Sequence, residues 1–306
     1  MRVLVTGATG VAGRSAVAAL VRAGHHVGAV ARGAAKAEAV RALGATPLEV
    51  DLFDAEATRD AVAGHDAVCN LATRIPPLAR AGRPSAWREN DRIRRVVSAH
   101  LVDAALAAGT VRLVQESIGF LYPDHGAEWI DEGLAPQPAV ATQSALDAEA
   151  NVARFTAAGR AGVVLRFAQF YGAATHHSRA MVTMARWLGL APMVGALDGY
   201  VSSIHADDIG PAVVAALGAR PGIYNVTDDE PLRRRELAAV FAAALGKKRL
   251  WTPGRLLAKL GGATSEAVSR SHRLSNAAFR AATGWAPTVR SARDGWPRII
   301  RDVLAG

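Results

Sequence analysis

Three glycines near the start of the chain constrain its fold more than any other feature. The segment Thr6-Gly7-Ala8-Thr9-Gly10-Val11-Ala12-Gly13 stands between an apolar run, Arg2–Thr6, and a stretch with helical spacing, Val11–Ala23. In a strand–turn–helix unit the first glycine allows the tight turn, the second lets a pyrophosphate approach the backbone, and the third lets the helix pack on the strand. The free N–H groups of the helix N-terminus also attract phosphate. The spacing therefore predicts a phosphate-binding turn built from Gly7, Thr9, Gly10, Val11 and Gly13.

Short apolar runs alternate with longer helical stretches over the first 170 residues. We expect strands at Arg2–Thr6, Val27–Ala31, Pro47–Val50, Ala67–Leu71, Arg112–Gln115 and Gly162–Phe167, and helices at 11–23, 34–43, 54–63, 91–108 and 144–158. The strands are apolar on both faces, which is typical of a sheet that helices cover on both sides. Right-handed crossovers then give a parallel, doubly wound α/β sheet of the Rossmann type.

The pattern changes after about residue 171. Helices are expected at 181–188, 208–217 and 232–245, and strands at 200–204 and 222–226, before a final stretch of short helices and loops. We predict a dinucleotide-binding domain over residues 1–171, to which residues 205–226 return. A smaller, mostly helical substrate-binding region would comprise residues 172–204 and 227–306.

The end of the second strand indicates which dinucleotide the turn would bind. Folds that prefer NAD usually carry an acid there for the ribose 2′-OH, whereas this chain has Ala31. Arg32 and nearby Lys36 are donors suited to a 2′-phosphate. The sequence therefore favours NADP, with NAD as the weaker alternative. Residues at the next strand ends complete the expected site: Asp51 and Leu52 at the adenine, and Leu71, Ala72 and Thr73 at the nicotinamide half.

Composition excludes several other classes of protein. The net charge of +9 is scattered, and its densest clusters, 233–235 and 247–249, are only three residues long, so we expect no nucleic-acid partner. No apolar run reaches the 18 residues or so of a membrane span, and no spacing suggests a metal site. Residues 1–6 enter a strand without the layout of a signal peptide. The single cysteine, Cys69, lies in an apolar stretch, which favours a buried thiol and a cytoplasmic protein.

Taken together, these motifs resemble the extended short-chain dehydrogenase/reductase superfamily, of the NAD-dependent epimerase/dehydratase type. The glycine segment is similar to its TGxxGxxG, and residues 70–73 (Asn-Leu-Ala-Thr) resemble its H-L-A-A. Residues 165–172 resemble L-R-x-x-x-x-Y-G, and residues 204–208 resemble I-H-V-x-D. The resemblance spans nearly the whole chain and adds Arg166 to the expected cofactor contacts. It also implies a structural role for His205 and a homodimer that pairs the helices at 91–108 and 144–158.

The resemblance breaks at the catalytic residues. The family uses a tyrosine as general acid/base, a lysine four positions later, and a serine after the fifth strand. Ser144 and Glu149 fit the frame Y-x-x-S-K-x-x-x-E, which puts Ala141 at the tyrosine and Ala145 at the lysine. No lysine lies between Lys36 and Lys247, and no tyrosine between Tyr122 and Tyr171, so no change of frame restores the dyad.

Ser117 and Tyr122 are the best remaining candidates for catalysis, although Tyr122 follows Ser117 by five residues where the family motif has four. Weaker candidates share a position near the expected cleft: Asp124, His125, Gln143, Asp147, His176 and His177. Trp87 and Trp129 could shape a pocket or simply pack in the core.

Three functions remain open at this stage. The first is an NADP-dependent enzyme with a non-standard acid/base set, acting on a small carbonyl, sugar-like or polyketide-like metabolite. The second is a non-redox enzyme, a cyclase, dehydratase or isomerase, on the same fold. The third is a non-catalytic NADP sensor.

Overall fold

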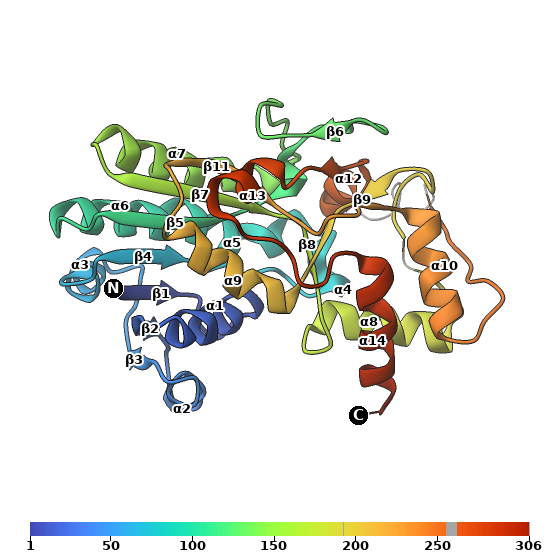
Figure 1. Cartoon of the computed structure of the whole chain (residues 1–306), viewed down its shortest axis with the longest axis horizontal. Helices are drawn as coiled ribbons and strands as arrows, with labels where there is room; N and C mark the ends of the chain where they lie inside the picture. The colour runs from blue at the N-terminus through green and yellow to red at the C-terminus, as the bar shows by residue number, and fades with distance from the viewer. Residues whose placement is uncertain (192, 255–261, 306) are drawn as a thin grey trace.

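The computed structural model describes residues 1–191, 193–254 and 262–305, and its centre is a seven-stranded parallel sheet (Figure 1). The strand order is β11-β7-β5-β4-β1-β2-β3. The strands are β1 (Arg2–Thr6), β2 (His26–Val30), β3 (Thr46–Leu48), β4 (Ala67–Asn70), β5 (Arg112–Ile118), β7 (Ala161–Phe167) and β11 (Gly222–Val226). The expected doubly wound sheet is confirmed, because the chain runs outward in both directions from β1 and β4.

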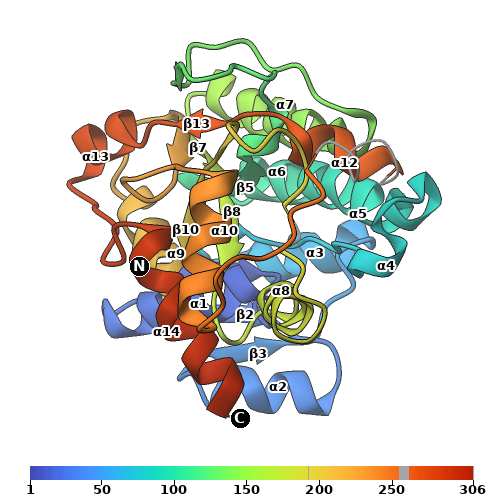
Figure 2. The same cartoon turned by 90° about the vertical axis from the view of Figure 1, so that its right-hand side faces the viewer.

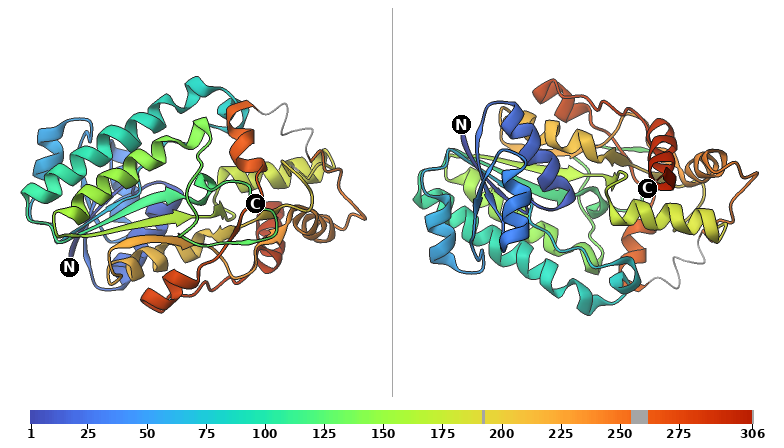
Figure 3. Two further views of the ribbon diagram at one scale, coloured as in Figure 1. Left: turned by 90° about the horizontal axis from the view of Figure 1, so that it is seen from above. Right: turned by 90° about the horizontal axis from the view of Figure 1, so that it is seen from below.

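Helices cover both faces of this sheet. One face packs against α1 (Val11–Arg22), α2 (Ala34–Arg41) and α9 (Ala206–Ala216). The other packs against α3 (Ala55–Val62), α6 (Ser98–Ala107) and α7 (Ser144–Ala157), and the last two lie side by side above the sheet (Figure 3). A π-helical turn, Ile93–Val97, joins α6 to α5 (Arg88–Arg92), so the single helix expected here contains a break in its hydrogen-bond pattern.

A second core lies beyond the carboxyl ends of the strands. It is formed by α8 (His176–Trp187), α10 (Arg234–Ala244) and α14 (Ala292–Ala305), which face the viewer in Figure 2. Tyr171 and Phe241 both pack on Trp296 at its centre, with ring centroids 5.4 Å and 4.4 Å apart. This core holds the C-terminal region against the end of the sheet where a ligand of an open α/β fold binds.

Smaller elements connect these layers. They are α4 (Leu78–Ala81), α12 (Gly262–Ser269), α13 (Ala277–Thr283), β6 (Trp129–Ile130), β8 (Gln169–Tyr171), β9 (Tyr200–Val201), β10 (Ser203–His205), β12 (Leu232–Arg233), β13 (Arg273–Leu274) and short 3-10 turns at Pro84–Trp87, Gly119–Leu121 and Val140–Thr142. Four two-residue strands, β6, β9, β12 and β13, pair only in two-stranded ribbons.

Several sequence expectations need correction. β5 runs to Ile118 and not to Gln115, because β7 pairs with its whole length. The strand expected at 200–204 is two strands, β9 and β10, with different partners. The helix expected from Leu232 starts at Arg234, since the two preceding residues pair with β9 as β12. The final stretch contains the expected short helices, α12 and α13, but it also contains a 14-residue helix, α14. Lys259 and the rest of segment 255–261 lie outside the described residues.

Candidate nucleotide and substrate site

The turn after β1 can be made only with glycine at two positions. Gly7 has φ +68°, and a Cβ on it would lie 2.3 Å from the carbonyl oxygen of Leu71. A Cβ on Gly13 would lie 2.1 Å from the carbonyl oxygen of Gly7. Both contacts are far below the sum of the atomic radii, so the turn and the close packing of α1 on β1 depend on these glycines.

The N-terminus of α1 is open to solvent. Gly10 is its N-cap, and a Cβ there would meet only the carbonyl oxygen of Gly7, at 3.3 Å. Val11 is 37% exposed, and Thr9 is half-buried with its carbonyl oxygen accepting from Arg14 Nε. The first amide groups of α1 therefore face a space that can admit a phosphate, and the turn fits a dinucleotide.

The ends of β2 and β3 carry charges of both signs. Arg32 and Asp51 are each 59% exposed and 3.9 Å apart, a loose ion pair. Gly33 precedes α2 and donates its N–H to the carboxylate of Glu49, at 3.3 Å. Lys36 is exposed on the first turn of α2. Arg32 and Lys36 could bind a 2′-phosphate here. That phosphate would compete with the carboxylate of Glu49 for the N–H of Gly33.

The other expected cofactor residues follow β3 and β4. Leu52 is half-buried, Leu71 is buried, and Ala72 and Thr73 are half-buried. A buried chain of hydrogen bonds fixes this edge: Thr6 Oγ1 donates to Asn70 Oδ1 at 2.6 Å, and Asn70 Nδ2 donates to Gln115 Oε1 at 2.8 Å. It ties β1, β4 and β5 together at the point where the strand order reverses, which is where open α/β sheets bind ligands.

Ser117, Tyr122 and Arg166 lie in the interior and not in the cleft where the sequence placed them. Arg166 binds Glu149 through two bonds of 2.9 and 2.6 Å, and Ser117 Oγ donates to the same carboxylate at 2.6 Å. Tyr122 OH accepts from Arg166 at 2.9 Å and donates to Asn225 at 2.9 Å. All three are at most 2% exposed. Burial also raises the pKa of the Tyr122 phenol, the opposite of what a tyrosine acid/base needs.

At the end of β5, Ile118 points to the face of the sheet opposite Ser117. Successive side chains of a strand point to opposite faces, and Ser117 points toward α7. Ile118 is half-buried, and it stands four residues before Tyr122, where the family motif has its serine. Ala141 is 4% exposed and packs with Ala81 and Trp87, and Ala145 is 0% exposed. All three residues in the serine, tyrosine and lysine positions are therefore apolar, and the two alanines are closely packed.

A buried ion pair near this edge was not foreseen. Arg94, in the π-helical turn, donates to Glu116 of β5 at 3.2 Å, and the two side chains are 1% and 7% exposed. Arg94 Nε and Nη1 have no hydrogen-bond partner. The sequence pattern did not indicate this pair, because the strand expected here ended at Gln115, one residue before Glu116.

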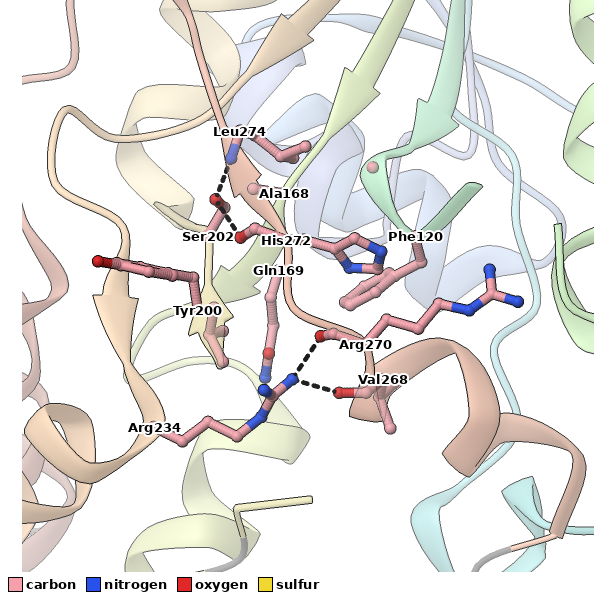
Figure 4. A pocket seen from close by; sticks show the side chains of 12 residues that line it. Phe120, Ala168, Gln169, Tyr200, Ser202, Arg234, Val268, Arg270, His272 and Leu274 are labelled. Carbon is pink, nitrogen blue, oxygen red and sulfur yellow. Dashed lines mark hydrogen bonds between the residues drawn. The ribbon is translucent and has the colours of Figure 1, made fainter. Parts of the chain in front are cut away.

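A pocket lies beyond the ends of β5 and β7, under the C-terminal region (Figure 4). Its lining residues come from distant parts of the chain: Gly119, Phe120, Ala168, Gln169, Tyr200, Val201, Ser202, Arg234, Val268, Arg270, His272 and Leu274. His272 packs edge-on against Phe120, with ring centroids 6.0 Å apart, and burial lowers its pKa to about 4. The imidazole is thus neutral at pH 7. This pocket is the candidate substrate site.

The remaining sequence candidates have other contacts. Asp124 accepts backbone N–H groups of Gly126 and Ser271, and Asp147 pairs with Arg95 at 2.6 Å. His177 contacts Gln169 at 3.0 Å, at the rim of the pocket.

Gln143 and His176 are exposed, and the backbone N–H of His125 donates to the carbonyl oxygen of Ser271. His205 caps α9, as the structural role predicts. Trp87 packs in the interior, whereas Trp129 is 48% exposed beneath the guanidinium of Arg273.

Cys69 is fully buried, and burial raises its pKa to about 12, as expected for an unreactive thiol. Within the described ranges, no helix is long and apolar enough to cross a membrane. The same residues contain no group of three or more side chains placed to hold a metal ion.

An open glycine turn on a doubly wound sheet, with a pocket beside the same strand ends, defines a dinucleotide-binding α/β enzyme. Residues 7–167 match the family described as NAD(P)H-binding. The chain belongs to this family, and it resembles the extended short-chain dehydrogenase/reductases while lacking their Tyr-x-x-x-Lys dyad.

Two relatives are reductases. The chain is 37% identical to the 3-diazoavenalumate denitrifying reductase of a Streptomyces species, over 97% of this chain and 100% of that protein. It is 28% identical to the 2-alkyl-3-oxoalkanoate reductase of Stenotrophomonas maltophilia (strain K279a), over 82% of this chain and 77% of that protein.

Solved structures share the fold. The dTDP-glucose 4,6-dehydratase of Streptomyces venezuelae, with NAD bound, gives a TM-score of 0.82 at 20% identity, covering 100% of this chain and 98% of that one. The UDP-glucose 4-epimerase of Thermus thermophilus, in complex with NAD, gives 0.78 at 23% identity and covers 100% of both chains.

Proposed function

We propose that this reductase-like enzyme uses NADPH to reduce a small organic acid whose reduction needs no proton from a tyrosine. The observation that carries the proposal is the apolar set Ile118, Ala141 and Ala145, at the positions where the family has its serine, tyrosine and lysine. Reduction of a carbonyl adds a hydride to carbon and a proton to oxygen, so it needs a proton donor next to the oxygen. None of these three side chains can donate one.

The names of the two relatives support an acid as the substrate. One is named for 3-diazoavenalumate and for removal of nitrogen, and the other for a 3-oxoalkanoate. An aryl diazonium acid fits the apolar set better than a 3-oxo acid. In the net reaction the aryl carbon gains a C–H bond from the hydride, the C–N bond breaks, and dinitrogen leaves with the electron pair of that bond. The charge passes to NADP⁺, and no proton is consumed.

The chain's own residues would bind and shield rather than move protons. NADPH, when bound, supplies the hydride. The turn at Gly7–Gly13 and the N-terminus of α1 would hold its pyrophosphate, and Arg32 and Lys36 its 2′-phosphate. Ile118 and the buried alanines Ala141 and Ala145 would keep water from the reacting carbon, which favours hydride transfer over hydrolysis of a reactive acceptor.

The test uses NADPH deuterated at C4 and 3-carboxybenzenediazonium as acceptor. We expect enzyme-dependent loss of absorbance at 340 nm, benzoate as product, and one deuterium in its ring by mass spectrometry. Two controls correct for direct reaction of NADPH with the diazonium compound. One contains no enzyme, and the other contains the Gly13→Val variant, in which the glycine turn cannot form. Reduction of a 3-oxo acid but not of the diazonium would refute the acceptor class.

Binding of NADPH without oxidation by any acceptor would instead support a non-redox enzyme or a sensor on this fold.

We also propose a homodimer through α6 and α7, as the family resemblance implies. Between these helices, Arg154 pairs with Asp103 at 2.6 Å on the surface. Light scattering of the purified protein should give twice the mass of one chain, and a monomer at micromolar concentration would refute this proposal.

A further inference from the structure

Three arginines are buried in the described part of the chain, and one of them forms no ion pair with an acid. Arg94 pairs with Glu116 at 3.2 Å and Arg166 with Glu149 at 2.6 Å. Arg234 is equally buried, at 2% exposed, yet it forms no ion pair within 4 Å with any described residue. The charge of Asp124 acts on it from a greater distance, and that carboxylate accepts the N–H groups of Gly126 and Ser271. A buried charge normally has a counter-ion, because removing it from water costs several kcal/mol. Arg234 therefore lacks the partner that the other two have.

The contacts of Arg234 use only part of its hydrogen-bonding capacity. Its Nη2 donates to the carbonyl oxygens of Val268 and Arg270, at 2.9 and 2.6 Å, and its Nη1 donates to that of Ala196, at 3.3 Å. A guanidinium has five N–H donors, so these three bonds leave two. Carbonyl oxygens fix the orientation of the group, but they do not neutralise its charge.

The guanidinium of Arg234 faces the pocket described above. Figure 4 shows it extending among Gln169, Val268 and Arg270. Arg270 is already paired with Glu266, at 2.6 Å, and no aspartate or glutamate is among the described lining residues. Burial lowers the pKa of Arg234 to about 10, so the group remains a cation at pH 7.

The size of the pocket suits a head group rather than a whole metabolite. The space open to water-sized groups is about 20 Å³, enough for one or two such groups. Phe120 and Tyr200 form part of its wall. A carboxylate has two oxygen atoms of this size and matches the planar donors of a guanidinium.

We propose that Arg234 is the anion-binding residue of the substrate pocket and takes the carboxylate of the acceptor. The inference rests on the proposed function only for the claim that the anion belongs to the substrate. Arg234 would fix the acid end of the molecule beyond the ends of β5 and β7, and so orient the rest of it toward the nicotinamide side of the cleft.

The test is calorimetric titration of the full chain with benzoate and with benzamide, its uncharged analogue, with and without NADP⁺. We expect wild-type protein to bind benzoate at least tenfold more tightly than benzamide. Arg234→Gln should lose this preference, and Arg234→Lys should keep part of it. Arg235→Gln is the matched control, because it removes the same charge from the next residue, which is 51% exposed and paired with Asp198. It should bind benzoate as the wild type does.

A second readout keeps the inference open to refutation. If Arg234→Gln fails to fold, the arginine Nε–H resonances of wild-type protein are decisive, with Arg234→Lys used for assignment. Benzoate, but not benzamide, must then shift the Arg234 signal. Equal binding of the two compounds, or a preference that survives Arg234→Gln, would overturn the inference. Neither result depends on NADPH turnover, so the proposed reductase activity could fail while the anion site holds, or the reverse.

Discussion

Replacement of Arg32 by alanine should weaken binding of NADPH and leave binding of NADH unchanged. In the free protein, breaking the ion pair between Arg32 and Asp51 costs little free energy, because the two groups are 3.9 Å apart and both side chains are 59% exposed. Such exposed pairs are worth less than about 1 kcal/mol. An exposed charge-assisted contact to a 2′-phosphate should contribute about 1–2 kcal/mol. The expected loss of NADPH affinity is therefore roughly 5–30-fold.

Calorimetry with both nucleotides at one fixed ionic strength measures this effect, since screening alters exposed charge contacts. Arg41→Ala is the matched control, because it removes the same charge from an exposed position of α2, at 57% exposure, where it pairs with Glu38. It should change neither affinity by more than about twofold. Equal weakening of NADPH and NADH by Arg32→Ala would refute the reasoning. Wild-type protein that binds NADH as tightly as NADPH would show that Glu49, and not Arg32, dominates this part of the site.

Three further substitutions test other parts of the structure. Glu149→Gln should lower the free energy of unfolding by about 3–5 kcal/mol in urea, because it leaves the charge of Arg166 buried without a counter-ion; a loss below about 1 kcal/mol would contradict the buried pair. Gly13→Ala should abolish NADPH binding while circular dichroism stays native, since its Cβ would lie 2.1 Å from the carbonyl oxygen of Gly7; retained affinity would show that the turn adapts. His272 has a folded pKa of about 4, below its unfolded value, so the unfolded chain binds more protons between about pH 4 and 6.5. Stability should therefore fall by up to about 3 kcal/mol as the pH drops from 7 to 4, and His272→Gln should flatten this dependence between pH 7 and 5 in urea titrations.

The nucleotide side of the site could be predicted because its determinants are local. Gly7 and Gly13 lie in one turn. A side chain on Gly7 would collide with Leu71 at the end of β4, and a side chain on Gly13 would collide with Gly7 itself. The strands were recognisable from apolar runs alone, since a parallel sheet covered on both faces buries nearly every side chain. Even so, these patterns place element ends only to within a few residues.

That uncertainty was enough to misplace the candidate catalytic residues. The pairing of β5 with β7 extends β5 to Ile118, and the two-residue period of a strand then turns Ser117 toward α7 and Ile118 to the opposite face. A strand that ended at Gln115 would have left both orientations open. The buried position of Tyr122 could not be predicted either, because its partners Arg166 and Asn225 are 44 and 103 residues away in sequence.

The sequence by itself determined the parallel sheet, the glycine turn and the absence of the tyrosine–lysine dyad, because each depends on residue type and short-range spacing. Only the tertiary structure showed that Arg94 has an acid partner and Arg234 has none. Charge compensation depends on which segments the fold brings within a few ångströms, and Arg234 meets carbonyl groups 34 to 38 residues away in the chain. No local pattern records such distances, because they result from the packing of the C-terminal helices over the end of the sheet.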